Sequence, residues 1–125
     1  MRVGFLAATG RPHNPHDPAN WLAATDAYRL AAERHCGVAF SFTDADPFWF
    51  LDIDKCYSAA GWSPRALEVC QLLAGAAVEV SQSGRGLHLF GTGTLPPHGC
   101  KNAAEGLELY HTGRFVALSG KQVQG

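Results

Sequence analysis

The segment Phe-Trp-Phe-Leu-Asp-Ile-Asp at residues 48–54 constrains the fold more than any other part of this chain. An apolar run this rich in aromatic residues is typical of a buried β-strand. Side chains alternate between the two faces of a strand, so Asp52 and Asp54 are predicted to share one face while Ile53 points into a core on the other. Two carboxylates held this close repel each other unless a cation lies between them. The segment therefore predicts a sheet with one buried face and a metal site on the other.

Length and composition fit one globular domain. The chain has 125 residues, of which 46% are hydrophobic and 17% charged, so we expect a single domain with a modest core over residues 1–125. The formal net charge of −1 excludes a general basic field, and any contact with nucleic acid has to come from local positive charge. No stretch is long enough to span a membrane. The four cysteines have no zinc-ligand spacing, which favours reduced thiols in a cytoplasmic protein without a zinc site.

Cap and turn signals divide the chain into strands and two helices. Asp17-Pro18 predicts the start of a helix that runs to about residue 35, and Ser63-Pro64 predicts a second helix to about residue 74. Residues 55–62 are expected to form a loop. Strands are expected at residues 2–6, 38–42, 48–54, 78–81, 87–90, 107–110 and 114–118.

Two pairs of these strands are predicted to form hairpins, because short turn segments join them. The first pair is 38–42 with 48–54, and the second is 107–110 with 114–118. The order of elements indicates an α+β fold, with a mostly antiparallel sheet and the helices packed on one face.

Three of the predicted strands carry an ionisable side chain between apolar neighbours. Asp52 alternates with aliphatic residues, and His88 and Glu108 each lie between two leucines. Any one of them alone fits the solvated face of a half-exposed strand. If the three strands are neighbours, however, one face of the sheet carries three carboxylates and an imidazole. That set suits a hard divalent cation, which takes oxygen ligands.

The segment at residues 81–88, Ser-Gln-Ser-Gly-Arg-Gly-Leu-His, favours phosphate binding. Small residues allow close approach of a ligand to the backbone, and consecutive free N–H groups form an anion nest. The guanidinium of Arg85 can clamp a phosphate through two hydrogen bonds. An ordinary Ser/Gly hairpin turn has the same composition, but Ser83 and Arg85 so close to His88 favour a cradle for a triphosphate.

Together these segments resemble the three ordered motifs of the archaeo-eukaryotic primase superfamily. The matching residues are Asp52-x-Asp54, then Ser81-x-Ser83-Gly84-Arg85-Gly86-x-His88, then Glu108-x-Tyr110-x-x-Gly113-Arg114-Phe115 and finally Ser119-Gly120. Further similarity lies in Thr9-Gly10-Arg11-Pro12, Asp17-Pro18-x-x-Trp21 and Gly37-Val38-x-Phe40. The most similar branch is the bifunctional DNA primase-polymerase (prim-pol) N-terminal domain of phage and plasmid replication proteins. The resemblance covers about residues 2–120 and departs from the pattern at Gly86, where many members have serine and where Ser83 is the expected substitute.

The resemblance implies a primase-polymerase catalytic core with an RRM-like sheet. Such an enzyme is a nucleotidyltransferase that extends a primer, or starts one, on a single-stranded template. The implied catalytic residues, which would also bind one or two Mg²⁺ or Mn²⁺ ions, are Asp52, Asp54 and Glu108. The implied nucleotide-binding residues are Ser83, Arg85, His88 and Arg114. Tyr110 or Phe115 would pack against the sugar or base, or would simply pack in the core of the last hairpin.

The resemblance also implies partners and a setting. The partners would be nucleoside triphosphates, single-stranded or primed DNA, and a helicase domain or protein, in the cytoplasm of a bacterial host and away from membranes. The chain would be a minimal core, without a helicase or helical template-binding region.

Two other functions stay open. One is a non-catalytic module of the same fold that binds nucleotides or single-stranded nucleic acid through aromatic and basic side chains. The other is a metal-dependent phosphodiesterase that uses the same acids.

Overall fold

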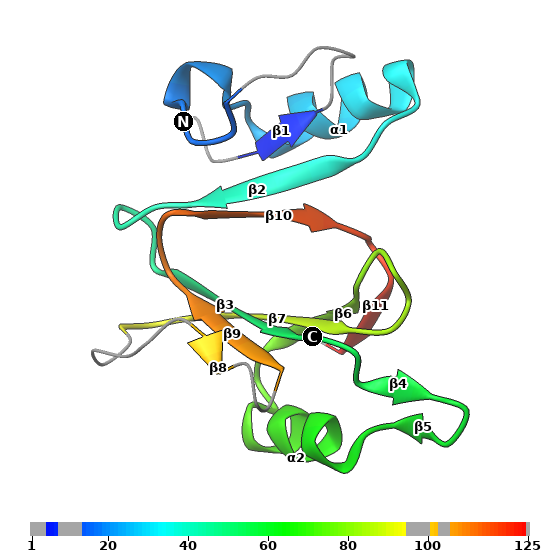
Figure 1. The fold of residues 1–125 in the computed structure, drawn as a ribbon. Coiled ribbons are helices and arrows are strands. Elements are labelled where there is room, and N and C mark those ends of the chain that lie inside the picture. Colours follow the sequence, from blue (N-terminus) through cyan, green and yellow to red (C-terminus); the bar gives the residue numbers. More distant parts are fainter. Residues whose placement is uncertain (1–4, 8–13, 95–100, 103–105, 125) are drawn as a thin grey trace. The chain divides into compact units, whose positions relative to one another are not determined.

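The structure is a computed structural model that describes residues 5–7, 14–94, 101–102 and 106–124 (Figure 1). The chain divides into two compact units. The first is Met1–Asp46 with Thr112–Ser119, and the second is Pro47–His111 with Gly120–Gly125. Each unit has a main sheet of its own within the described residues, and every strand pairing there is antiparallel. The predicted α+β class with mostly antiparallel sheets is therefore confirmed, whereas the single domain stays a prediction.

The first unit contains a three-stranded sheet and one α-helix. The sheet has the order β1 (Phe5–Ala7), β2 (Val38–Phe42), β10 (Arg114–Leu118). Helix α1 (Ala24–Arg34) buries Ala27 and Ala31 beside Val38. These small residues let the helix approach the sheet closely, since they have little side chain to hold it away. The strand expected at residues 2–6 lies partly outside the described residues, and the segment 9–12 lies wholly outside them.

The first helix begins later than predicted. Asp17 does act as an N-cap, because its Oδ1 accepts the N–H of Ala19 at 3.0 Å, but the element it starts is only the 3₁₀ turn η1 (Pro18–Asn20). The chain is extended again at Trp21, whose indole N–H donates to the carbonyl of Pro15 at 2.8 Å. This bond anchors the indole to the preceding loop, so α1 starts only at Ala24.

The second unit contains a six-stranded sheet centred on β3 and β7. Its order is β11 (Gln122–Gln124), β6 (Ala77–Val80), β7 (Leu87–Thr92), β3 (Phe48–Ile53), β9 (Leu107–Tyr110), β8 (Lys101–Asn102). Residues 55–62 were expected to be a loop, but they contain the short strands β4 (Tyr57–Ser58) and β5 (Gly61–Trp62), which pair with each other. Two-residue strands are too short for alternation to show in the sequence.

The core of the second unit lies between its sheet and helix α2 (Pro64–Leu72), which Figure 1 shows on one side of that sheet. Ile53 is 1% exposed and Leu89 is fully buried, as the alternation predicts. The predicted start of α2 is confirmed, because Ser63 Oγ accepts the N–H of Ala66 at 3.1 Å. A cap of this kind contributes about 1 kcal/mol to helix stability. Within the described parts of the chain, neither α-helix has the length and apolar content needed to cross a membrane.

Trp49 and Gly91 face each other across β3 and β7. The indole covers the glycine so closely that a Cβ built on Gly91 would lie 2.1 Å from the Trp49 ring. The indole N–H also donates to the carbonyl of Thr92 at 3.2 Å. This pair leaves no room for a side chain at position 91.

Both predicted hairpins are wrong. Strand β2 pairs with β1 and β10, whereas β3 pairs with β7 and β9. Strands β9 and β10 likewise belong to different sheets. Turn residues mark where a strand ends, but the partner of a strand depends on contacts with residues far away in the sequence.

Candidate functional site

A row of polar residues crosses the six-stranded sheet at Asp52. Asp52 lies opposite His88 of β7 on one side and opposite Glu108 of β9 on the other. One strand further out, Glu79 of β6 is paired with His88 and Lys101 of β8 is paired with Glu108. Residues in register across a sheet share a face. We call this set, in the order Lys101, Glu108, Asp52, His88, Glu79, the polar row.

The polar row follows from the alternation of apolar residues along the same strands. Leu51 and Ile53 flank Asp52, and Leu87 and Leu89 flank His88; all four aliphatic residues belong to the core against α2. A register slip of one residue would move them from the core to the other face, so their burial holds the polar row in place. The condition set by the sequence, that the three strands with Asp52, His88 and Glu108 be neighbours, is met.

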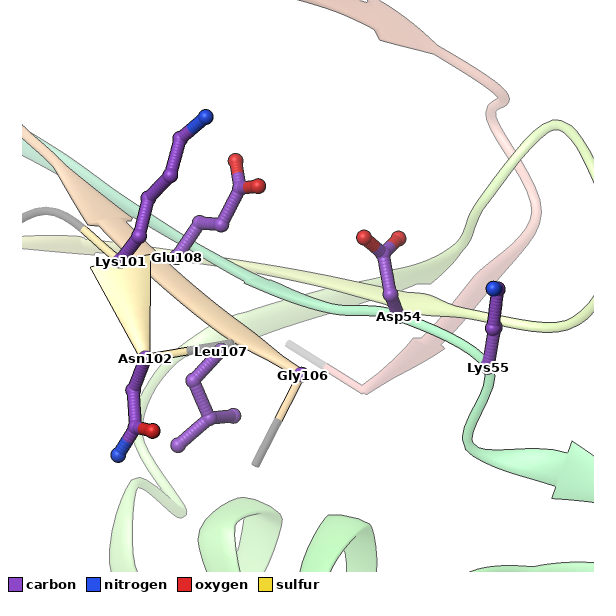
Figure 2. A pocket seen from close by; sticks show the side chains of 7 residues that line it. All are labelled: Asp54, Lys55, Lys101, Asn102, Gly106, Leu107 and Glu108. Carbon is purple, nitrogen blue, oxygen red and sulfur yellow. The ribbon is translucent and has the colours of Figure 1, made fainter. Parts of the chain in front are cut away.

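Asp54 lies just past the end of β3. Its N–H donates to the carbonyl of Gly106 at 2.9 Å, which continues the pairing between β3 and β9 beyond the last strand residue. Figure 2 shows the carboxylates of Asp54 and Glu108 on the same side of these strands and the side chain of Leu107 on the other. Asp54 is exposed, whereas Asp52 is only 9% exposed. The two acids of the first motif therefore share a face but differ in their contact with water.

A hollow of about 430 Å³ lies beside Asp54 and Glu108. Its lining residues, shown in Figure 2, are Asp54, Lys55, Lys101, Asn102, Gly106, Leu107 and Glu108. Small-molecule sites commonly measure roughly 300–1,000 Å³, so the hollow is large enough for a ligand of that kind. Carboxylates suit a cation and ammonium groups suit a phosphate, and both kinds of group line this hollow.

His88 is held by a carboxylate that the sequence analysis missed. Glu79 Oε2 lies 2.8 Å from His88 Nδ1, and both side chains are buried. The other ring nitrogen, Nε2, lies 3.9 Å from Asp52 Oδ1, and the ring of Phe50 packs edge-on against the imidazole at 5.3 Å. Glu79 stands between two valines, which is the same alternation that identified the other acids. The signal was therefore present in the sequence.

Glu108 is held by a tyrosine on its own strand. The hydroxyl of Tyr110 donates to Glu108 Oε2 at 2.9 Å, and Tyr110 is 9% exposed. Residues two apart on a strand share a face, which brings the hydroxyl to the carboxylate. In this structure Tyr110 orients an acid, and its packing against a sugar or base stays a prediction.

The serine-rich turn at residues 81–86 is closed on itself. Ser81 Oγ accepts the N–H of Gly86 at 3.0 Å, and Ser83 Oγ accepts the N–H of Arg85 at 3.2 Å. The N–H of Gly84 donates to the carbonyl of Ser81 at 3.0 Å. The predicted nest of free N–H groups is therefore wrong for residues 84–86, because the serines already accept them.

The side chain of Arg85 remains suited to a phosphate, because it is exposed while its backbone is fixed. The carbonyl of Arg85 accepts the N–H groups of Cys56 and Tyr57 at 2.8 and 3.1 Å. These bonds anchor the turn beside the segment that follows Asp54.

Gly86 is required by close packing of the backbone. A Cβ at this position would lie 2.8 Å from the carbonyl oxygen of Ile53 and 3.1 Å from Ser81 Oγ. The serine found here in many proteins with this motif pattern would therefore not fit without movement of β3.

Arg114 and Phe115 lie on β10 in the first unit, whereas the polar row lies in the second. Their predicted phosphate and base contacts therefore stay predictions. Within its own unit, Phe115 is 45% exposed and meets the ring of His16 edge-on at 5.8 Å.

The acids fit a hard cation in chemistry, though they are not gathered into a finished site. Asp52, Asp54 and Glu108 offer carboxylate oxygens from one face of two adjacent strands, which is the donor type of Mg²⁺ and Mn²⁺. Among the residues that the structure describes, no group of three or more His, Cys, Asp or Glu side chains is placed to hold a metal ion. Binding of Mg²⁺ or Mn²⁺ stays a prediction.

The chain is similar to a phage protein named DNA primase-polymerase, from Nitratiruptor phage NrS-1. The two sequences are 29% identical over 134 aligned residues, which take in 99% of this chain. The chain spans only 18% of the length of that protein. No family model matches the chain. The similarity supports a relationship with primase-polymerases.

Proposed function

We propose that this chain is the catalytic core of a primase-polymerase, which adds nucleotides to a primer or starts one on a single-stranded template. The observation that carries the proposal is the polar row, in which Asp52 lies between Glu108 and His88 on three adjacent strands. Acids that can bind a cation thus lie next to a histidine that can contact a phosphate, on adjacent strands of one sheet. The similarity to a DNA primase-polymerase over 99% of the chain supports this chemistry.

In this proposal the metal ligands are Asp52, Asp54 and Glu108. When bound, one or two Mg²⁺ or Mn²⁺ ions would stabilise the attacking and leaving oxygens of an in-line displacement at the α-phosphate. Tyr110 would keep Glu108 in one orientation through its hydrogen bond of 2.9 Å. Exposed Asp54 and the open hollow would leave room for a ligand to enter.

The phosphates would be held by positive and hydrogen-bonding groups around these acids. His88, Arg85 and Ser83 would contact the triphosphate, with Arg114 as a further contact. Lys55 and Lys101 line the hollow and supply the local positive charge that a chain of net charge −1 needs to attract an anion. The partners proposed are nucleoside triphosphates, single-stranded or primed DNA and a helicase domain or protein, in the cytoplasm of a bacterial host.

The direct test is nucleotide incorporation. The chain is incubated with a bare or primed single-stranded DNA template, ribo- or deoxynucleoside triphosphates, and Mg²⁺ or Mn²⁺. Products longer than the primer, or new primers on the bare template, are expected. Absence of any product over a wide range of enzyme concentrations would contradict the proposal.

A second candidate is a non-catalytic module that binds nucleotides or single-stranded nucleic acid. The arrangement of the acids favours it, because within the described parts of the chain they do not yet form a three-ligand group. This candidate predicts binding that persists in a chelator and after Asp54→Asn, with no incorporation. Cleavage of DNA with Mg²⁺ and no nucleotide would instead indicate a phosphodiesterase.

A further inference from the structure

We propose that Glu79 is a positioning residue of the nucleotide site, which fixes the tautomer and orientation of His88, and that Gly120 fixes Glu79 in turn. The functional part of this inference rests on the proposed function, in which His88 meets a phosphate of the nucleotide. The hydrogen-bonded chain from Gly120 through Glu79 to His88 is a property of the fold and can be tested without any ligand.

Glu79 accepts a hydrogen bond on each of its two oxygens. Oε2 lies 2.8 Å from His88 Nδ1, and Oε1 accepts the backbone N–H of Gly120 at 3.1 Å. Glu79 is 8% exposed and His88 is 7% exposed, so water competes little for these bonds. The register of β6 and β7 places the two residues directly opposite each other. The carboxylate is therefore fixed from both ends.

The carboxylate determines which nitrogen of His88 carries the proton. An ionised carboxylate only accepts hydrogen bonds, so Nδ1 must donate to it. Nδ1 thus keeps its proton, and Nε2 is the nitrogen turned toward Asp52, at 3.9 Å from its Oδ1. The ring is also held at its edge by Phe50. As a result, the ring of His88 has one orientation before any ligand arrives, which lowers the entropy cost of binding. Phosphate oxygens only accept hydrogen bonds, so Nε2 meets one as a donor when that nitrogen carries a proton as well.

Glutamine cannot keep both hydrogen bonds of Glu79 with the same tautomer of His88. Both neighbours, the His88 ring N–H and the Gly120 backbone N–H, are donors, whereas a glutamine side chain has one acceptor oxygen and one NH₂ group. Either one of the two bonds is lost, or the NH₂ group donates to Nδ1 and the ring proton of His88 moves to Nε2. Glu79→Gln is therefore expected to disturb His88 even though the side chain keeps its size.

The hydrogen bond from Gly120 to Glu79 gives a role to a motif that has none in the proposed chemistry. Ser119-Gly120 belongs to the motif pattern in the sequence but carries no group that reacts. In the structure, Gly120 has a φ of 72°, and the next residue, Lys121, accepts the N–H of Val80 at 2.9 Å. The turn at Gly120 thus presents its N–H to Glu79 at the point where the chain joins β6. The task of this motif is to support His88 through Glu79.

The first experiment measures the tautomer directly. Long-range ¹H–¹⁵N correlation spectra of the labelled chain, without nucleotide or metal, are recorded at a pH above the usual titration range of histidine. His88→Gln assigns the ring signals. In the wild-type chain we expect the shift of a protonated nitrogen for Nδ1 and of an unprotonated nitrogen for Nε2. An Nε2-protonated ring, or shifts averaged between the two tautomers, would overturn the inference without any variant of Glu79.

The second experiment links the tautomer to binding. The affinity for a nucleoside triphosphate with Mg²⁺ is compared among the wild-type chain, Glu79→Gln and the control Glu68→Gln, whose carboxylate is exposed on α2. For histidines that bind metal ions, loss of the residue that orients the ring typically costs 10- to 100-fold in metal affinity. By analogy we expect Glu79→Gln to lower triphosphate affinity about tenfold, at the lower end of that range, and to change the ring spectrum. The control should match the wild-type chain in both measurements.

Unchanged affinity and an unchanged spectrum in Glu79→Gln would overturn the inference while leaving the proposed function intact. No triphosphate binding by the wild-type chain would instead contradict the proposed function, whatever the spectrum shows.

Discussion

The polar row is closed on one side of Asp52 and open on the other. Toward β6, His88 and Glu79 are buried and joined by a hydrogen bond of 2.8 Å. Toward β8, Glu108 is half-buried, Lys101 is exposed, and both line a hollow of about 430 Å³. The same alternation of residues thus produces two different environments within a single row across one sheet.

The difference indicates a division of tasks around Asp52. A buried and hydrogen-bonded side does not have to rearrange when a ligand arrives, and preorganised groups of this kind are effective in catalysis. An exposed side with acids and lysines can admit a cation and a phosphate together.

Asp52→Asn should have the largest effect, because it removes the charge at the centre of the row. The side chain keeps its size, so the chain should still fold. A metal ion supplies several kcal/mol of charge stabilisation, and its loss would lower incorporation by about 10³-fold or more. The measurement is primer extension with Mg²⁺ and with Mn²⁺, with Asp26→Asn on the exposed face of α1 as the control. Activity within tenfold of wild type would remove Asp52 from the centre of the site.

Gly86→Ala tests the closed side, where β7 begins. The added Cβ would lie 2.8 Å from the carbonyl of Ile53, and overpacking of this kind costs about 1–3 kcal/mol in the free energy of unfolding. The matched control is Gly75→Ala, since a Cβ there meets nothing within 4 Å. Urea denaturation of both variants measures the difference. Equal stability would show that β7 can move away from β3, so that the closed side is not rigid.

Tyr110→Phe tests how the open side is held. The change removes only the hydroxyl that donates to Glu108, and one such hydrogen bond contributes about 1 kcal/mol, or roughly fivefold in an equilibrium constant. We expect the concentration of Mn²⁺ needed for half-maximal incorporation to rise by about this factor, because Glu108 would lose its fixed orientation. Tyr28→Phe, on exposed α1, is the control. No change in the Mn²⁺ requirement would show that Glu108 is oriented by other groups.

Lys101→Gln should have the smallest effect. An exposed charge is worth about 1 kcal/mol or less, and salt screens it. We expect triphosphate affinity to fall about two- to threefold at low salt and to match the wild-type value at high salt. Titrations at two salt concentrations measure this, with Lys121→Gln, at an exposed position on the second unit outside the hollow, as the control. A salt-independent loss would indicate that Lys101 makes a direct and desolvated contact.

Much of the site could be predicted because alternation along a strand is a local property. The face that carries Asp52, His88 and Glu108 follows from their aliphatic neighbours alone. Glu79 obeys the same rule, but an acid between valines has no chemical meaning until its partner across the strand is known. Its partner, His88, is set by the pairing of β6 with β7.

The strand pairings could not be predicted, because the partner of a strand is not a local property of its sequence. The partners of β2 and β3 are far apart in the sequence, so turn signals between the two strands suggested a hairpin that does not form. At the predicted start of the first helix the chain forms only a 3₁₀ turn, and the indole of Trp21 donates to the carbonyl of Pro15, a contact that helix propensity does not report. The free N–H groups expected at residues 84–86 are taken up within the turn: the hydroxyls of Ser83 and Ser81 accept those of Arg85 and Gly86, and the carbonyl of Ser81 accepts that of Gly84.

The pairing of Trp49 with Gly91 has a consequence for how this site can vary. The indole occupies the space of a side chain at position 91, so neither residue can be exchanged freely while the other stays. The residues before and after Gly91 are Phe90 and Thr92, and their side chains would keep the indole from lying over the backbone as it does at Gly91. The pair thus favours the observed alignment of β3 with β7, which sets Asp52 opposite His88. Substitutions at Trp49 or Gly91, which take no part in the proposed chemistry, are therefore expected to disturb the pairing of Asp52 with His88.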